Sequence, residues 1–134
     1  MFSEANAIRD EMIAWRRHLH RHPEVSFQEN ATAQFIVEKL SAWGLEVVHP
    51  VARTGVVARV GRGRPCIALR ADMDALPLTE ATDLDYASET HGAMHACGHD
   101  AHMAALLGVA RLMADDPPPR GSVTFVFQPS EEKI

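Results

Sequence analysis

The side chains best suited to chemistry lie within one stretch of eight residues, from His95 to His102. The stretch contains three histidines, a cysteine and an aspartate, which are ligands of divalent transition metals. Only Gly98 separates Cys97 from His99, and its backbone freedom allows both side chains to reach one ion. A buried free cysteine beside surface histidines is the alternative, and the density of donors favours a metal site.

The same stretch directly precedes a predicted helix at 100–114. The positive end of a helix dipole lowers the pKa of a nearby thiol. We therefore expect the Cys97 thiolate, the form that binds a metal, to be favoured by its position.

Two carboxylates, Asp72 and Asp74, follow a strand-like segment. Open α/β sheets place their sites at the carboxyl ends of strands. Metal-binding histidines usually donate their second N–H group to a carboxylate, and Asp74 suits that role. An aspartate that caps backbone amides within a turn is an equally good interpretation.

Glu131 and Glu132 follow another strand-like segment. Neighbouring residues in an extended chain point to opposite sides, so one carboxylate can bind a metal while the other faces water. Metal-assisted hydrolysis needs both a Lewis acid and a separate base. A solvated acidic pair is the simpler alternative when these two residues are considered alone.

Hydrophobic periodicity predicts the elements that position these residues. Helices are expected at 4–21, 28–43 and 100–114, and strands at 45–49, 55–60, 65–72 and 122–128. We expect 65–72 to be a buried central strand, 61–64 a hairpin turn and 74–94 an ordered loop. The order of elements predicts an α/β fold, a mixed β-sheet with helices on both faces.

The remaining histidines and the second cysteine carry weaker signals. His18, His20 and His22 are expected to complement the dipole of the first helix. His91 and His95 are expected to be surface loop residues, and Cys66 is expected to lie in the core.

Composition narrows the possible partners. The chain has 134 residues, 46% of them hydrophobic, and a formal net charge of −5. The negative charge argues against nucleic acid and anionic membranes as partners. No apolar run approaches the roughly 20 residues of a membrane span, and the N-terminus does not read as a secretory signal. A cytoplasmic protein without a disulfide is expected.

Four segments, in order along nearly the whole chain, carry a family resemblance. The chain resembles the amidohydrolase branch of the aminoacylase/carboxypeptidase-type di-metal hydrolases, which includes hippurate hydrolases, N-acyl-amino-acid amidohydrolases and indoleacetyl-amino-acid hydrolases. The segments are Arg17-His18-Leu19-His20 through Pro23-Glu24, Leu69-Arg70-Ala71-Asp72-Met73-Asp74-Ala75-Leu76-Pro77, His95-Ala96-Cys97-Gly98-His99-Asp100-Ala101-His102 and Phe127-Gln128-Pro129-Ser130-Glu131-Glu132.

The resemblance implies a function and a role for each residue. Cys97, His99 and Glu132 would bind metal, Glu131 would be the general base that activates water, and Asp74 would support the metal ligands. Two divalent ions (Zn, Mn, Ni or Co) would assist hydrolysis of N-acyl amino acids or similar small amides.

The resemblance also implies an organisation for the chain. Residues 1–134 would be the N-terminal part of a zinc-peptidase-like catalytic domain. Two further histidine ligands, a lid and dimerisation domain and the C-terminal part would lie downstream. The intact protein would be a homodimer or homotetramer, and the 134 residues alone would be inactive.

Three alternatives remain at this point. The chain could be a catalytically silent fragment of this fold, or a non-enzymatic metal-binding module. A dipeptidase or carboxypeptidase of the same superfamily is the third, and the Cys-Gly-His-Asp sequence at 97–100 argues against it.

Overall fold

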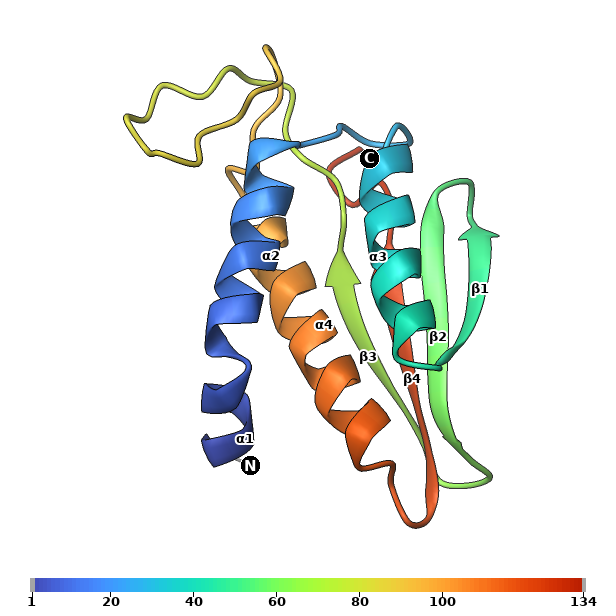
Figure 1. The fold of residues 1–134 in the computed structure, drawn as a ribbon. Helices are drawn as coiled ribbons and strands as arrows, with labels where there is room; N and C mark the ends of the chain where they lie inside the picture. Colours follow the sequence, from blue (N-terminus) through green and yellow to red (C-terminus); the bar gives the residue numbers. More distant parts are fainter. Residues whose placement is uncertain (1, 134) are drawn as a thin grey trace.

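The computed structural model describes residues 2–133. Each predicted element is present with its ends displaced by a residue or two, except that the first predicted helix is divided into two helices at Ile8. The helices are α1 (Phe2–Ala7), α2 (Arg9–Arg21), α3 (Asn30–Ala42) and α4 (His99–Asp115), and the strands are β1 (Glu46–Val51), β2 (Gly55–Arg62), β3 (Cys66–Asp72) and β4 (Gly121–Gln128) (Figure 1).

The four strands form one mixed sheet in the order β1-β2-β4-β3. β2 is antiparallel to both β1 and β4, whereas β3 is parallel to β4. In the parallel pair Asp72 lies opposite Gln128, so both strands end at the same edge of the sheet. The chain returns between them through α4, and this β-α-β connection brings the start of the helix to that edge.

β3 was expected to be a buried central strand, and that prediction is wrong. Among the described residues β3 has one neighbour, β4, and Ile67 near its start is 56% exposed. The apolar run in β3 is typical of a strand that is covered on both faces, whereas the helices of residues 2–133 cover only one, which explains the error. The turn at 61–64 is also not a hairpin turn, because β4 separates β2 from β3.

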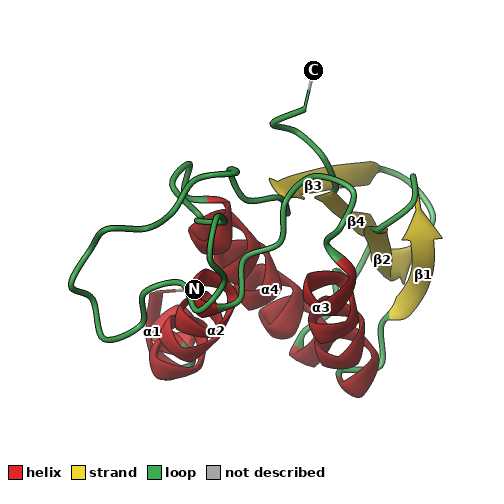
Figure 2. Ribbon diagram, turned by 90° about the horizontal axis from the view of Figure 1, so that it is seen from above, coloured by secondary structure: helices red, strands yellow, loops and turns green. Residues whose placement is uncertain are grey.

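The helices of residues 2–133 lie on one face of the sheet (Figure 2). The mixed α/β class is as predicted. Helices were expected on both faces of the sheet, and residues 2–133 form them on one face only. Alternation along β2 and β4 explains the difference. Val56, Phe125 and Phe127 are buried beneath the helices, whereas Arg59 and Thr124 face the other side.

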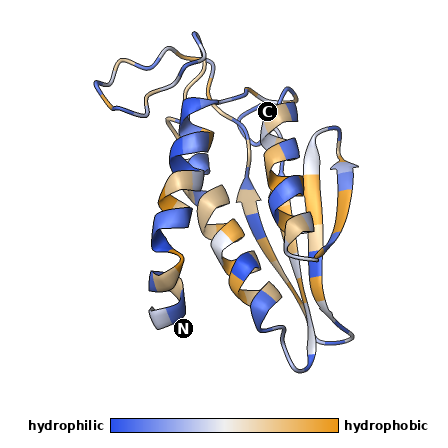
Figure 3. Cartoon of the chain, in the orientation of Figure 1, coloured by the Kyte–Doolittle hydropathy of each residue, from blue (hydrophilic) through white to orange (hydrophobic). Residues whose placement is uncertain are grey.

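Only some of the helices contact the sheet directly. α3 and α4 contact the strands directly, and α2 packs against α4. Gly108 permits this close approach, because a Cβ atom there would lie 2.8 Å from Met12 Sδ. Figure 3 shows α2 as mostly hydrophilic, as expected of a helix that buries only one stripe. Trp15 and Leu19 form that stripe.

A long connection joins β3 to α4 and projects at the upper left of Figure 1. It contains neither helix nor regular strand, and the prediction of an ordered loop is confirmed. Leu76 pairs with Met94 across its base. Glu80 is folded inside it and accepts the amide of Ser88 at 2.6 Å.

Candidate metal centre

The residues predicted to do chemistry meet where β3 and β4 end and α4 begins. Asp74 follows β3, Glu131 and Glu132 follow β4, and His99 is the first residue of α4. Carboxyl ends of neighbouring parallel strands are where α/β folds place their sites. The strand topology therefore unites segments that are far apart in sequence.

Three side chains at this edge form what we call the donor cluster: Cys97, His99 and Glu132. One potential ligand atom from each lies within 4.8 Å of the others. Gly98 makes the approach possible, since it precedes α4 with a φ of +83°, in the left-handed region. Residues with a Cβ atom rarely adopt that conformation. These are the three residues predicted to share a metal.

The hydrogen bonding of His99 fixes which ring nitrogen is free. Nδ1 lies 2.8 Å from the backbone carbonyl oxygen of Asp74. A carbonyl can only accept, so Nδ1 carries the proton and Nε2 of the neutral ring presents a lone pair. Nε2 faces Glu132 Oε1 at 3.8 Å and Glu131 Oε2 at 4.0 Å.

This arrangement fits a divalent cation. Glu132 Oε1 is buried without a hydrogen-bond partner among the described residues. The imidazole lone pair and the carboxylate oxygen are both acceptors, so they need a positive charge between them to be stable together. Sulfur, nitrogen and oxygen donors in one cluster are compatible with a transition metal such as zinc.

The expectation that the helix dipole lowers the pKa of Cys97 is wrong. A hydrogen bond to Glu132 and burial raise the pKa of this thiol, and the negative charges of Glu132, Glu131 and Asp72 add to the effect. The carboxylates therefore outweigh the helix dipole. A cation would reverse this balance, because it stabilises the thiolate directly.

Asp74 is fully buried and organises the loop that carries both glutamates. Its carboxylate accepts the Ser26 hydroxyl at 2.6 Å and the amides of Glu131 and Glu132 at 3.0 and 2.9 Å. Burial alone would raise the pKa of Asp74, but the hydrogen bonds from Ser26 and the two amides outweigh it and the pKa is lowered. The closest contact of Asp74 with His99 is thus made by its backbone carbonyl, and its carboxylate oxygen Oδ1 lies 3.6 Å from the same His99 Nδ1 atom while it also fixes the glutamates.

The two glutamates lie in a bend and not in the extended chain that was expected, and the carboxylates of both approach His99 Nε2. They nevertheless differ in exposure. The side chain of Glu131 is 41% exposed, whereas that of Glu132 is 20% exposed. Glu132 is therefore the more enclosed of the two carboxylates, whereas Glu131 is the more accessible to water.

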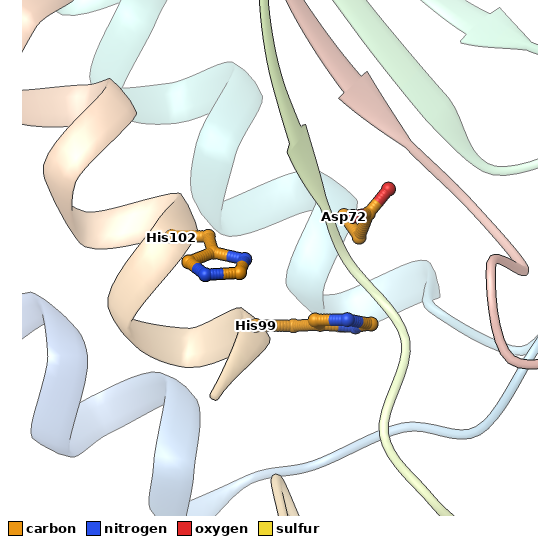
Figure 4. A group of neighbouring side chains, drawn as sticks. All are labelled: Asp72, His99 and His102. Atoms are coloured by element: carbon orange, nitrogen blue, oxygen red, sulfur yellow. The ribbon is translucent and has the colours of Figure 1, made fainter. Parts of the chain in front are cut away.

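A second group, made of Asp72, His99 and His102, also has its ligand atoms within 4.8 Å (Figure 4). His102 lies one turn along α4, and its ring centroid is 5.7 Å from that of His99. Asp72, however, already accepts a hydrogen bond from Arg70 Nε at 3.0 Å. The donor cluster is the better cation site because Glu132 Oε1 is buried and has no hydrogen-bond partner among residues 2–133.

A different set of polar side chains lies on the other side of the first turn of α4. We call it the paired cluster: Arg16, His20, Glu80 and Asp100. His20 lies 2.8 Å from Asp100 Oδ2 and 3.2 Å from Glu80 Oε1, and Arg16 Nε lies 3.2 Å from the same Asp100 oxygen. The predicted dipole role of His20 is therefore wrong, because its ring is buried between two carboxylates.

Two further expectations are corrected. His95 was expected at the surface but is 4% exposed, and burial lowers its pKa to about 4. Cys66 was expected in the core but is exposed, since it lies at the start of the edge strand β3.

Two residues that support the glutamate loop were not anticipated: Glu29 contacts it directly, and Ser26 contacts it through Asp74. Ser26 binds Asp74, and Glu29 accepts the amide of Ser130 at 2.9 Å. Their partners lie 48 and 101 positions away in the chain. No local pattern marks such contacts, although Ser26 follows directly on the Pro23-Glu24 segment of the family resemblance.

Known proteins share both the sequence and the architecture. The chain is 50% identical over 131 residues to the N-acyl-L-amino acid amidohydrolase of Geobacillus stearothermophilus, covering 93% of this chain and 35% of that protein. It is 45% identical over 125 residues to the protein named IAA-amino acid hydrolase ILR1-like 5 of Arabidopsis thaliana, covering 92% of this chain and 29% of that protein.

A solved structure agrees with these relatives. The dinuclear metal binding peptidase of the M20 family from Bacillus subtilis superposes with a TM-score of 0.88 at 46% identity, covering 95% of this chain and 36% of that structure. The chain thus spans about a third of the length of the relatives that it matches. Residues 68–134, half of the chain and the half that contains the donor cluster, match the sequence profile of Peptidase family M20/M25/M40. The protein therefore belongs to peptidase family M20/M25/M40.

Proposed function

We propose that the complete protein is a metal-dependent amidohydrolase that cleaves the amide bond of N-acyl amino acids or similar small amides. The observation that carries the proposal is the convergence of Cys97, His99 and Glu132 beside the accessible carboxylate of Glu131. This arrangement provides cation ligands and a separate base at one point, which metal-assisted hydrolysis requires. The names of the amidohydrolase relatives support the choice of substrate.

The donor cluster would hold the metal on this part of the protein. Cys97 Sγ, His99 Nε2 and one oxygen of Glu132 would be the ligand atoms. Bound divalent ions would supply Lewis acidity, both to acidify water and to polarise the acyl carbonyl. The proposal includes two ions, as in the dinuclear structural relative, with Zn, Mn, Ni or Co as candidates.

Glu131 would move the proton. Its Oε2 atom lies 4.0 Å from the ligand nitrogen of His99, so its carboxylate borders the place where water would be activated. The carboxylate would take the proton from water and pass it to the nitrogen of the leaving amine. Asp74 would assist by holding the Glu131 and Glu132 amides in position through its buried carboxylate.

The family resemblance leads us to further proposals for the complete protein. We propose a cytoplasmic location, a homodimer or homotetramer, and a small-molecule amide as the partner rather than nucleic acid or a membrane. The net charge of −5 supports the exclusion of nucleic acid. No helix among residues 2–133 is long and apolar enough to cross a membrane.

The proposal is tested with the complete protein, first stripped by a chelator and then reloaded separately with each of the four candidate metals. Substrates would be N-acyl amino acids and, as a control, dipeptides with a free amino group. We expect release of the amino acid from acyl substrates only in the metal-loaded protein. Hydrolysis confined to free dipeptides, metal-independent hydrolysis, or metal binding without hydrolysis would each contradict the proposal.

A further inference from the structure

Glu29 is a completely buried glutamate that makes no contact within the donor cluster. It lies directly before α3, and its carboxylate has two hydrogen-bond partners from distant segments. Oε2 accepts the hydroxyl of Thr54 at 2.5 Å, and Oε1 accepts the backbone amide of Ser130 at 2.9 Å. Both carboxylate oxygens are therefore occupied, which accounts for the tolerance of this buried acid.

The backbone amide of Ser130 is the first of three consecutive amides that donate hydrogen bonds to buried carboxylates. Glu29 accepts from Ser130, and Asp74 accepts from the next two amides, those of Glu131 and Glu132. Ser130 has a φ of +55°, in the left-handed region, which is unfavourable for a residue with a Cβ atom. The hydrogen bond from Glu29 thus restrains the strained residue that sets the direction in which the two glutamates leave β4.

The carboxylate of Glu29 is itself well anchored. The backbone oxygen of Glu29 accepts the amide of Ala33 in the first turn of α3. Thr54, in the turn between β1 and β2, is also buried and fixes the second carboxylate oxygen. Glu29 therefore ties the glutamate loop to the first turn of α3 and to the β1–β2 turn.

We propose that Glu29 is a positioning residue for Glu131 and Glu132. The inference rests on the proposed function, because the geometry that Glu29 maintains is that of a metal ligand and a base. Outer partners that orient metal ligands typically contribute about 10- to 100-fold to metal affinity or activity. Loss of the Glu29 carboxylate is expected to act in the same way.

Glu24 offers a matched control within the same segment. Its carboxylate also accepts two hydrogen bonds, from the amides of Ala31 and Thr32 at 3.1 and 2.7 Å. These bonds cap α3 and do not involve the glutamate loop. Glu24→Ala and Glu29→Ala thus each remove two hydrogen bonds from one region, but only the second releases Ser130.

The experiment measures the affinity of the complete protein for Zn²⁺ by competition with a chromogenic chelator, together with kcat and thermal unfolding. Both alanine variants should unfold at lower temperature than the wild type. Glu29→Ala should in addition bind Zn²⁺ about tenfold more weakly and lose at least about tenfold in kcat when saturated with metal. Glu24→Ala should retain both values.

A conservative variant separates the hydrogen bonds from the charge. In Glu29→Gln the amide oxygen can accept from Ser130, and the amide N–H can donate to the Thr54 hydroxyl, which accepts as well as donates. We expect this variant to recover Zn²⁺ affinity to within about threefold of the wild type, because hydrogen-bond geometry is preserved. If the alanine variant does not fold, Glu29→Asp carries the test, since its shorter side chain cannot keep both contacts and should weaken Zn²⁺ binding.

The inference would be overturned if Glu29→Ala, or Glu29→Asp in its place, bound Zn²⁺ as the wild type does. It would also be overturned if Glu24→Ala lost as much affinity, or if Glu29→Gln were as impaired as Glu29→Ala. Failure of the proposed function is recognised separately, because it would appear as unchanged Zn²⁺ affinity after Cys97→Ala.

Discussion

Two clusters of histidine and carboxylate side chains lie at the first turn of α4, and they differ in how closely the histidine is paired with its carboxylates. In the paired cluster, Asp100 Oδ2 has His20 and Arg16 as partners within 3.2 Å. In the donor cluster, the ligand nitrogen of His99 faces Glu132 Oε1 at 3.8 Å, and that oxygen has no hydrogen-bond partner within the described part of the chain. His99 and Asp100 are thus consecutive in the chain but belong to different clusters, His99 to the donor cluster and Asp100 to the paired cluster.

The comparison separates residue type from residue role. The same kinds of side chain form a paired network in one cluster, where Asp100 Oδ1 is the only buried side-chain atom that lacks a hydrogen-bond partner among residues 2–133, and a set of unpaired acceptors that fits a cation in the other. We therefore expect substitutions in the paired cluster to lower stability, and substitutions in the donor cluster to lower metal affinity.

The largest effect on metal binding is expected from His99→Ala. Removal of a ligand should weaken the affinity of the complete protein for Zn²⁺ by more than about 100-fold, above the range for outer partners. His102→Ala is the matched control, because His102 is exposed and lies one helical turn away. The Zn²⁺ affinity of the His102→Ala variant should differ from that of the wild type by less than about threefold. Equal losses in a Zn²⁺ titration of the two variants would favour the group that contains Asp72 instead.

The paired cluster should show the opposite response. His20→Ala leaves the buried carboxylates of Asp100 and Glu80 without their shared partner, which should lower the free energy of unfolding by about 3 kcal/mol. Denaturant unfolding measures this loss. His22→Ala, at an exposed histidine of the same segment, should cost less than about 0.5 kcal/mol. Strong loss of Zn²⁺ affinity in a folded His20→Ala protein would break the distinction between the clusters.

A smaller effect is expected at Gly98. Gly98→Ala forces a side chain into a φ of +83° and should cost about 1–2 kcal/mol, although a Cβ atom there has open space. Gly63 has the same φ and the same open space but lies far from the donor cluster in the fold, in the turn between β2 and β3. Both alanine variants should lose similar stability in thermal unfolding, and only Gly98→Ala should also bind Zn²⁺ more weakly. Equal Zn²⁺ affinities would contradict a role for the Gly98 turn.

The smallest effect concerns His18, outside both clusters. Burial against neighbours that include Phe35 lowers the pKa of His18, and the positive charges of His22, Lys39 and Arg21 add to the effect. Because its pKa is higher in the unfolded chain, about 6.5, the unfolded state binds the proton more readily. The contribution of His18 to the free energy of unfolding is therefore fully present above about pH 6.5 and is lost as the pH falls below that value. The difference in unfolding free energy between the wild type and His18→Gln should be smaller at about pH 5 than at about pH 7.5. A difference that does not change with pH would contradict the lowered pKa of His18.

Local patterns predicted much of the fold and of the donor cluster. The helices and strands follow from hydrophobic periodicity within each segment. Cys97, His99, Asp74 and the two glutamates were singled out because they stand at the ends of those elements, whereas only the family resemblance implied that Glu132 is the ligand and Glu131 the base. In an α/β fold such ends lie at one edge of the sheet.

What the sequence left undetermined depends on distant partners. The exposure of β3 depends on what covers its two faces and its free edge, and periodicity within β3 does not contain that information. His20 has the sequence context of a surface helix, yet its partners Glu80 and Asp100 are 60 and 80 positions away. The raised pKa of Cys97 likewise arises from carboxylates contributed by other segments, which outweigh the local helix dipole.

The most direct test of the account compares Glu131→Gln with Glu132→Gln in the complete protein. The two variants make the same chemical change at neighbouring residues, and metal content and turnover of an N-acyl amino acid are measured for both. We predict that Glu131→Gln retains its metal and loses turnover, because it removes only the base, whereas Glu132→Gln loses metal as well. Metal loss in Glu131→Gln with retention in Glu132→Gln, or full turnover in Glu131→Gln, would contradict the account.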